Sequence, residues 1–279
     1  MTVPEADRRV FKQARSGIVT LLTDFGIDDY FVGAMKGVIL SRFAQAVLVD
    51  ITHNIPPHDI CAAAFTLFAA HRNFPPGTIH VAVVDPGVGS DRRPVIVETE
   101  DHLFVGPDNG LFSPVLSLHP RAKVRHVTNS AYFLPNVSAT FHGRDIFAPV
   151  AAALAQGTAP EFMGPTIQNP VLLQPNAWDP KADFAPVGSV IHIDRFGNCV
   201  TSFAWERVQK FSGGRSIHLR LKDFEITKRL PYYENATLEP DQPFVIVGSS
   251  GFLEISIWSG SAARVLKVGV GEPVHLEVV

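Results

Sequence analysis

The chain has 279 residues, of which 46% are hydrophobic and 18% are charged. This charged share is below the average for soluble proteins, so a sizeable core is possible and disorder is excluded for most of the chain. A formal net charge of −3 gives no general reason to expect nucleic-acid binding. The two cysteines, Cys61 and Cys199, exclude a disulfide framework or a cysteine-ligated zinc site. The longest apolar stretch, residues 62–70, is far too short for a membrane span.

The composition divides the chain into four parts. Residues 1–16 are polar and charged, so we expect a loose tail without a signal peptide and a cytoplasmic protein. Residues 17–165 alternate short apolar runs with helical patterns, which is typical of an α/β domain. Residues 166–186 are rich in proline and are expected to form a linker. Residues 187–279 hold short β-like runs.

Strands and helices are expected to alternate in the first domain. The expected strands cover residues 18–22, 46–51, 78–84, 94–98 and 102–105. The expected helices cover residues 30–42, 60–72, 109–116 and 145–155. Asp28 and Asp29 precede the first helix and Asp59 precedes the second, where carboxylates can meet free N–H groups. The alternation predicts a mostly parallel sheet with helices on both faces.

The second domain is predicted to contain strands alone. They cover residues 187–194, 216–221, 244–247, 252–257, 263–267 and 274–278. Glycine-containing turns, among them 196–198 and 248–251, separate them. We expect a smaller all-β, barrel-like domain.

Polar residues follow the first three expected strands. Asp24 follows the first strand, His53 and Asn54 follow the second, and Asp85 follows the third. Ligands of open α/β sheets bind beyond the carboxyl ends of the strands, so these loops are expected to converge on one edge. Asp24 either caps a turn or accepts the hydroxyl protons of a ribose.

The loop of residues 85–92 is the most informative segment. Its glycines allow a sharp turn that leaves Asp85 and Arg92 able to face each other. The alternative is a tight turn with a surface salt bridge, which contributes little. The loop is neither a Walker A motif, because it lacks Gly-Lys-Ser/Thr, nor a GxGxxG motif, so a phosphate-binding loop is weakly supported. His142, beside Gly143 and just before a helix, is either a structural residue or a functional one.

Two turns of the second domain carry further candidates. Residues 194–198 form either a plain hairpin turn or a site in which Asn198 reads an adenine edge. Residues 248–251 form either a β-turn or a nest of N–H groups for a carboxylate.

Taken together, these segments resemble the S-adenosyl-L-methionine hydroxide adenosyltransferases, which are hydrolase relatives of the fluorinase and chlorinase enzymes. The resemblance runs from about Ile18 to Val279. It rests on six motifs in order, namely Leu-Thr-Asp-Phe-Gly at 22–26, Asp-Pro-Gly-Val-Gly at 85–89, Pro-Asp-Asn-Gly at 107–110, Phe-His-Gly-Arg-Asp at 141–145, Phe-Gly-Asn at 196–198 and Gly-Ser-Ser-Gly-Phe-Leu-Glu at 248–254.

The resemblance implies cleavage of S-adenosyl-L-methionine to adenosine and L-methionine. It also implies homotrimers, or dimers of trimers, with active sites between the N-domain of one subunit and the C-domain of the next. The family's polar triad falls on Asp85, Arg92 and His142. Together with Gly143, where the fluorinase carries serine, this triad favours water over halide. Trp258 and Ser259 depart from the family, in which asparagine is usual near the adenine.

The resemblance also places the substrate. Asp24 would hold the ribose hydroxyls, Asp194 and Ser249 the methionine ammonium and carboxylate with help from Glu254, and Asn198 the adenine. Phe141 and Tyr233 would be apolar or stacking walls. The leaving group is already charged, so the reaction requires no metal and no cofactor.

The expected step is in-line displacement at the ribose C5′ carbon. Arg92 would favour the developing anion, while Asp85 would orient the attacking water. Either His142 or Asp85 is the general base. Water held in line with the C–S bond would contribute as well.

Three rival functions stay open. Asp24, Asp28, Asp29, Asp85 and His142 supply enough ligands for a divalent-metal nucleotide phosphohydrolase. A non-catalytic adenosyl-binding module predicts binding without turnover. A halogenase predicts formation of a 5′-halo-adenosine.

Overall fold

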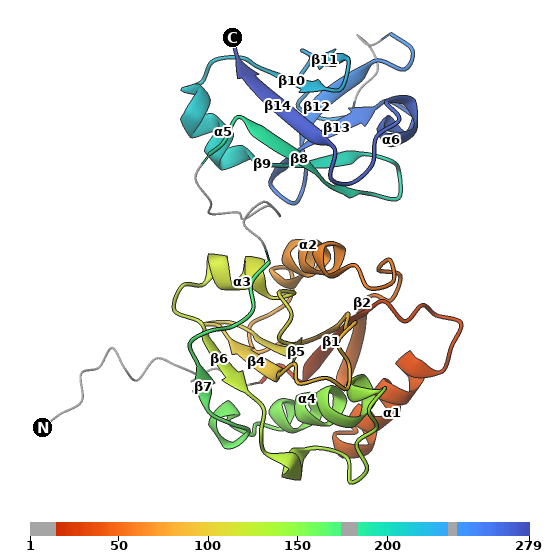
Figure 1. The fold of residues 1–279 in the computed structure, drawn as a ribbon, viewed down its shortest axis with the longest axis vertical. Helices are drawn as coiled ribbons and strands as arrows, with labels where there is room; N and C mark the ends of the chain where they lie inside the picture. The colour runs from red at the N-terminus through yellow and green to blue at the C-terminus, as the bar shows by residue number, and fades with distance from the viewer. Residues whose placement is uncertain (1–14, 174–183, 234–238) are drawn as a thin grey trace, which may run out of the picture. The chain divides into compact units, whose positions relative to one another are not determined.

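The computed structural model describes residues 15–173, 184–233 and 239–279. The chain forms two compact units that divide between Leu173 and Gln174 (Figure 1). Most of the predicted tail lies outside the described residues, as do residues 174–183 of the predicted linker. The expected start of this linker at residue 166 is wrong, because Thr166–Ile167 form a strand paired with the first sheet.

The first unit is built on a seven-stranded sheet with the order β2-β1-β3-β5-β4-β6-β7. The strands are β1 Ile18–Thr23, β2 Val47–Thr52, β3 Ile79–Val83, β4 Pro94–Glu98, β5 Leu103–Pro107, β6 Lys123–His126 and β7 Thr166–Ile167. Strands β2, β1, β3 and β5 are parallel neighbours, and only β4 and β7 run against the common direction. The predicted mostly parallel sheet is therefore confirmed.

Helices cover both faces of this sheet (Figure 1). They are α1 Phe31–Arg42, α2 Ile60–His71, α3 Ser113–Leu118 and α4 Ala148–Ala155, with short helical turns at Ser130–Tyr132, Gly143–Phe147 and Pro160–Phe162. Successive β1 residues supply both layers, since Leu21 packs with α1 and α4 and Leu22 packs with α2 and α3. Both layers are buried, so the sheet is a rigid base for the loops at its edge.

Carboxylates at the helix starts behave differently from one another. Asp59 caps α2 as expected, because its Oδ1 accepts from the Ala62 N–H at 2.9 Å. The expected role of Asp28 and Asp29 at α1 is wrong: Tyr30 is the N-cap residue, without a side-chain cap, and the first turn holds no acidic residue.

The second unit is an antiparallel sheet with the order β11-β10-β14-β8-β9-β13-β12. The strands are β8 Val187–Ile193, β9 Cys199–Ala204, β10 Ile217–Leu221, β11 Phe224–Ile226, β12 Pro243–Val247, β13 Phe252–Ile257 and β14 Pro273–Val278. The two edge strands approach each other, because Val245 of β12 exchanges backbone hydrogen bonds with Lys228 and Leu230 just beyond β11. The predicted barrel-like domain is confirmed.

Two helices belong to this unit, α5 Trp205–Ser212 and α6 Ala262–Val265. The strand expected over 263–267 is wrong. Ser261 caps a short helix there, with its Oγ accepting from the Arg264 N–H at 3.2 Å.

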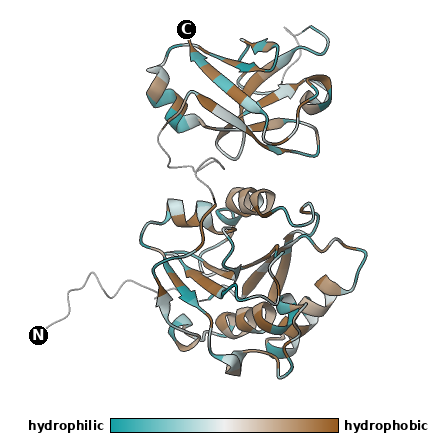
Figure 2. Cartoon of the chain, viewed as in Figure 1, coloured by the Kyte–Doolittle hydropathy of each residue, from teal (hydrophilic) through white to brown (hydrophobic). Residues whose placement is uncertain are grey.

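Burial follows the two types of sheet. All residues of β3 and β5 are buried, whereas β10 and β14 alternate between buried and more exposed residues. Figure 2 shows the same contrast in hydropathy, with long brown strands in the first unit and mixed strands in the second. Within the described residues, no helix is long and apolar enough to cross a membrane.

Candidate active site

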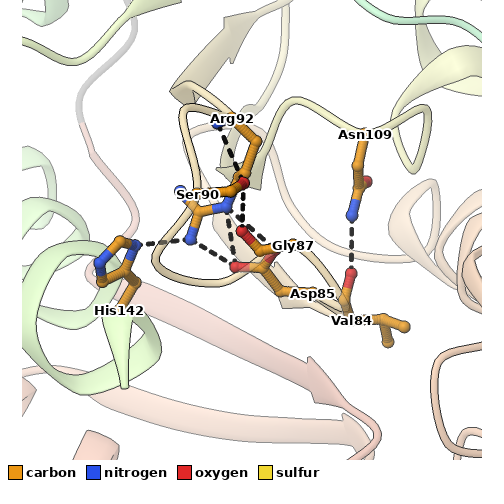
Figure 3. Close-up of polar contacts among 7 residues, drawn as sticks. All are labelled: Val84, Asp85, Gly87, Ser90, Arg92, Asn109 and His142. Atoms are coloured by element: carbon orange, nitrogen blue, oxygen red, sulfur yellow. Dashed lines mark hydrogen bonds and ion pairs between the residues drawn. The ribbon is translucent and has the colours of Figure 1, made fainter. Parts of the chain in front are cut away.

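Asp85 and Arg92 form a buried ion pair on the loop that follows β3. Arg92 Nε lies 2.9 Å from both carboxylate oxygens of Asp85, and Nη2 makes a further short contact with Oδ2 (Figure 3). Their side chains are only 9% and 5% exposed for Arg92 and Asp85. The expected pairing is therefore present, and its burial separates it from the surface salt bridge that was its alternative.

Ser90 and Gly89 give the loop its shape. Ser90 Oγ donates to the Gly87 carbonyl oxygen at 2.6 Å and accepts from the Arg92 N–H at 3.3 Å. Gly89 has a φ of 79°, and a Cβ at this position would overlap the Ala139 carbonyl oxygen. The loop thus closes against the segment that leads to His142.

His142 contacts the ion pair from a separate element. It stands at the start of a π-helical turn, Gly143–Phe147, that leads into α4. Arg92 Nη2 lies 2.7 Å from His142 Nδ1 (Figure 3). Burial, and then the positive charge of Arg92, lower the pKa of His142 below its ordinary value. The imidazole is therefore neutral at pH 7, and the contact makes Nδ1 the acceptor of the Arg92 N–H.

One hydrogen-bond donor of Arg92 has no acceptor in the described structure. Its Nη1 is buried and has no hydrogen-bond partner among the described residues. A buried guanidinium N–H without a partner is costly, so this atom is suited to an incoming oxygen. A fixed cation, a carboxylate and a neutral imidazole in contact can orient a water molecule, stabilise developing negative charge and accept a proton.

Asp24 lies in the first unit, after β1. Its side chain is 9% exposed, and Oδ2 accepts from the His58 N–H at 2.9 Å. The neighbouring His53 does not turn toward a common site: its Nδ1 bonds Thr23 Oγ1 at 2.9 Å, and the imidazole is buried. Of the loops expected to converge, the one holding His53 therefore packs inward.

Phe141 and Gly143 flank His142 in the sequence and lie in an apolar cluster. The Phe141 ring meets Phe31 edge-on, with ring centroids 5.1 Å apart, and meets Phe25 at 5.9 Å. A Cβ at Gly143 would lie 3.2 Å from Met35 Sδ. Phe141 is therefore covered on several sides, and Gly143 leaves room for no larger side chain without a shift of its neighbours.

The second unit holds a continuous polar chain. Asp194 Oδ1 accepts from the N–H groups of Phe196 and Asn198 at 2.9 Å each, and Oδ2 accepts from Asn198 Nδ2 at 2.8 Å. The same Nδ2 lies 3.4 Å from the hydroxyl of Tyr233, which donates to Glu254 Oε2 at 3.2 Å. Burial raises the pKa of Glu254 and of Tyr233.

The turn at 248–251 has two serines with different surroundings. Ser249 is exposed, whereas Ser250 Oγ is buried and lacks a partner within the described part of the chain. Gly248 packs so closely on the Glu254 carboxyl that a Cβ there would overlap it. The turn thus joins the end of the polar chain.

The structure therefore brings the predicted residues together in two groups, one in each unit. In the first, Arg92 contacts both Asp85 and His142. In the second, Asp194, Asn198, Tyr233 and Glu254 are linked and Ser249 lies on the adjoining turn. In the described ranges, no three His, Cys, Asp or Glu side chains are grouped so as to hold a metal ion.

Two family models match the chain. The N-terminal domain of the SAM hydroxide adenosyltransferases matches residues 19–164, and their C-terminal domain matches residues 188–275. The chain belongs to this family. The order of the two matched domains follows the two units of the structure.

Proteins with curated names are similar to this member of the SAM hydroxide adenosyltransferase family over most of its length. A protein of Thermus thermophilus named (R)-S-adenosyl-L-methionine hydrolase is 37% identical over 92% of this chain and 98% of its own length. One of the same name from Methanocaldococcus jannaschii is 34% identical over 90% and 92%. A fluorinase of Nocardia brasiliensis is more distant, at 26% over 74% and 78%.

A solved structure has the same fold. The crystal structure of an uncharacterized conserved protein from Thermotoga maritima superposes with a TM-score of 0.83 at 32% identity, covering 93% of this chain and all of that one (100%).

Sequence reasoning missed two residues that shape the triad loop of this family member. Ser90 lies in the loop of residues 85–92 and Asn109 in the motif at 107–110, but sequence reasoning assigned a role to neither residue. Asn109 Nδ2 donates to the Val84 carbonyl oxygen at 2.8 Å, directly before Asp85. The Asn-Gly pair at 109–110 was the available signal, because an asparagine in a turn commonly bonds nearby backbone.

Proposed function

We propose that the protein hydrolyses S-adenosyl-L-methionine to adenosine and L-methionine. A water oxygen bonds to the ribose C5′ carbon while the C5′–S bond breaks, and its electron pair passes to sulfur. Water loses one proton, so the sulfonium and water become two neutral products and one H⁺. The observation that carries the proposal is the buried Asp85–Arg92–His142 contact with its unpartnered Arg92 Nη1. The names of the relatives support it.

The triad assigns a task to each group. Arg92 stays protonated and favours the hydroxide-like nucleophile, with Nη1 as the free donor. Asp85 holds Arg92 through contacts with its Nε and Nη2 and orients the water beside it. Either Asp85 or His142 accepts the proton: in this structure Arg92 engages both Asp85 oxygens, and its Nη2 engages Nδ1, the one acceptor nitrogen of the neutral His142 imidazole.

The remaining predicted residues bind the substrate in this proposal. Asp24 holds the ribose hydroxyls, with Phe141 and Gly143 shaping the wall beside His142. The polar chain from Asp194 through Asn198 and Tyr233 to Glu254, with Ser249, binds the methionine and adenine ends. No cofactor takes part, and the cytoplasm stays the predicted compartment.

The decisive assay is chromatography of adenosine and methionine released from S-adenosyl-L-methionine, with and without chelator and chloride. Equimolar products that neither addition alters support the hydrolase. Loss with chelator and recovery with Mg²⁺ would favour the metal phosphohydrolase instead. A 5′-chloro-adenosine product would favour the halogenase, and tight binding without turnover would favour the binding module.

We further propose a homotrimer, or a dimer of trimers, in which each active site takes the first unit of one subunit and the second unit of the next. Light scattering gives the assembly state. Mixing Asp85→Ala subunits with Asp194→Ala subunits, at a substrate concentration too low for either variant alone to turn over, then tests the sharing of sites. Activity that returns on mixing supports shared sites, and a mixture as inactive as its parts contradicts them.

A further inference from the structure

The segment Asp108–Asn109, directly after β5, bonds to both ends of the loop that carries Asp85 and Arg92. Asn109 Nδ2 donates to the Val84 carbonyl oxygen at 2.8 Å, one residue before Asp85 (Figure 3). The Asp108 N–H donates to the Arg93 carbonyl oxygen at 2.9 Å, one residue after Arg92. A single strand end therefore holds the loop where it begins and where it ends.

Side chains strengthen the second attachment. Arg93 Nε donates to Asp108 Oδ2 at 2.8 Å, and the Asp108 side chain is 4% exposed. The other oxygen, Oδ1, accepts from the Val171 N–H at 2.8 Å. Arg93 also donates to the side chain and the backbone of Asn169, at 3.0 and 2.7 Å. The attachment thus includes the last described segment of the first unit, and charge-assisted bonds of this kind are strong.

The first attachment depends on the orientation of one amide. The Leu111 N–H donates to Asn109 Oδ1 at 3.2 Å, which fixes the oxygen and leaves Nδ2 for the Val84 carbonyl. Gly110, with a φ of 99°, follows at once, and a Cβ there would lie 3.1 Å from the Leu173 nitrogen. The turn therefore positions Asn109 tightly.

We propose that Asp108 and Asn109 are positioning residues for the hydrolysis, an inference that rests on the function proposed above. Asp85 and Arg92 lie on one loop, so their ion pair moves with it as a unit. His142 lies on another element, and the 2.7 Å contact of Arg92 Nη2 with His142 Nδ1 is the hydrogen bond that joins that element to the ion pair. The anchoring of the loop therefore helps to set the distance between the ion pair and His142.

The first test is Asn109→Asp. The carboxylate keeps the size of the side chain and the acceptor for the Leu111 N–H, but it has no proton to donate to the Val84 carbonyl. We expect kcat to fall on the order of ten- to a hundred-fold, because a misplacement near 1 Å costs about that much. KM for S-adenosyl-L-methionine should change by less than about two-fold, since no proposed binding residue is altered.

Asn129→Asp is the matched control. Asn129 makes the same pair of bonds in the same unit, with Nδ2 donating to the Phe162 carbonyl at 2.9 Å and Oδ1 accepting from the Ala131 N–H at 3.1 Å. Within the described residues it makes no hydrogen bond to the loop of residues 85–92, and its variant should keep the parent kcat. Arg93→Lys is a second probe, because it keeps the charge facing Asp108 but loses the forked bonds to Asn169; a smaller fall in kcat is expected.

NMR can follow the titration of His142 and so measure its pKa. A substitution that only weakened the turn at Asn109 would leave this pKa unchanged. Burial and Arg92 lower the pKa of His142, while Asp85 and Asp145 raise it by less, so a loop that moves away with both Asp85 and Arg92 lets that pKa rise in Asn109→Asp. An unchanged kcat together with an unchanged His142 titration would overturn the proposal, as would equal losses of kcat in the Asn109 and Asn129 variants. The titration needs no substrate. Failure of the parent protein to turn over S-adenosyl-L-methionine would therefore refute the proposed function alone, and the titration would still decide on the anchoring.

Discussion

The two units use their polar groups in opposite ways. In the first, a cation, a carboxylate and an imidazole from two separate elements contact one another and leave Arg92 Nη1 buried without a partner in the described structure. In the second, the carboxylate of Asp194 is occupied by three donors of its own turn, and Asn198 extends this network to Tyr233. An unsatisfied charged donor suits a reacting atom, whereas the network of Asp194, Asn198 and Tyr233, which lies beside the unpartnered but neutral Ser250 hydroxyl, suits a binding surface. We therefore expect substitutions in the triad of the first unit to act on kcat and those in the polar chain of the second to act on KM.

The largest effect should come from the triad. Asp85→Asn and His142→Ala should each lower kcat by about 10²–10⁴-fold, the range for a positioned acid–base group, with smaller changes in KM. Steady-state rates of adenosine formation at varied substrate concentration measure both kcat and KM. Glu98→Gln is the control, because it removes another buried carboxylate–arginine pair, with Arg125, on the same sheet. A triad variant with wild-type kcat would contradict the division of labour between the units.

Lowering the pH should change the free energy of unfolding of the two units differently. His71, His80 and His102 form a buried cluster whose ring centroids lie 5.0–6.2 Å apart, with His119 beside His71 at 6.4 Å. Burial lowers the pKa of His71 to about 4 and that of His80 well below its ordinary value. The unfolded chain thus binds more protons below pH 6.5, and the first unit loses stability as the pH falls. His71 alone contributes a loss of about 2 kcal/mol between pH 7 and pH 5.

The second unit should respond with the opposite sign. The raised pKa of Glu254 means that the folded form holds its proton more tightly, so this group adds stability as the pH falls. All three tryptophans lie at residue 178 or beyond, so their fluorescence reports on the second unit, while circular dichroism at helix wavelengths reports mainly on the first. Between pH 7 and pH 5, the urea midpoint of the circular dichroism transition should fall, whereas the midpoint of the fluorescence transition should not. His71→Phe should reduce that movement; a movement equal in both signals would refute the assignment.

The fold was readable from the sequence where burial was simple. Continuous apolar runs predicted β1 and β3 to within a residue or two, because both faces of these strands are covered. Short elements were not readable: Ser261–Val265 is too brief for a helical period, so its apolar residues suggested a strand. Local pairs such as Asp85 with Arg92 could be predicted from one loop. The bonds from Arg92 to His142 and from Asn109 to Val84 span 50 and 25 residues, and only the sheet order brings them together.

The smallest effect should come from the hydroxyl of Tyr233. It accepts from Asn198 Nδ2 at 3.4 Å and donates to Glu254 Oε2 at 3.2 Å, so Tyr233→Phe removes the link in the middle of the polar chain. A lost hydrogen bond of this kind costs about 1 kcal/mol, which corresponds to a rise in KM of roughly five-fold. The ring is kept, so apolar contacts with the substrate are unchanged.

Tyr232→Phe is the matched control for this prediction, because Tyr232 is the neighbouring residue and 58% exposed. It should leave both kinetic constants unchanged. Because the second unit binds and does not react in our proposal, kcat of Tyr233→Phe should stay within about two-fold of the parent value. A fall in kcat that matches the fall in kcat/KM would instead mean that the interaction forms only in the transition state. The polar chain of the second unit would then act on the reacting atoms, and the contrast between the two units would be wrong at that point.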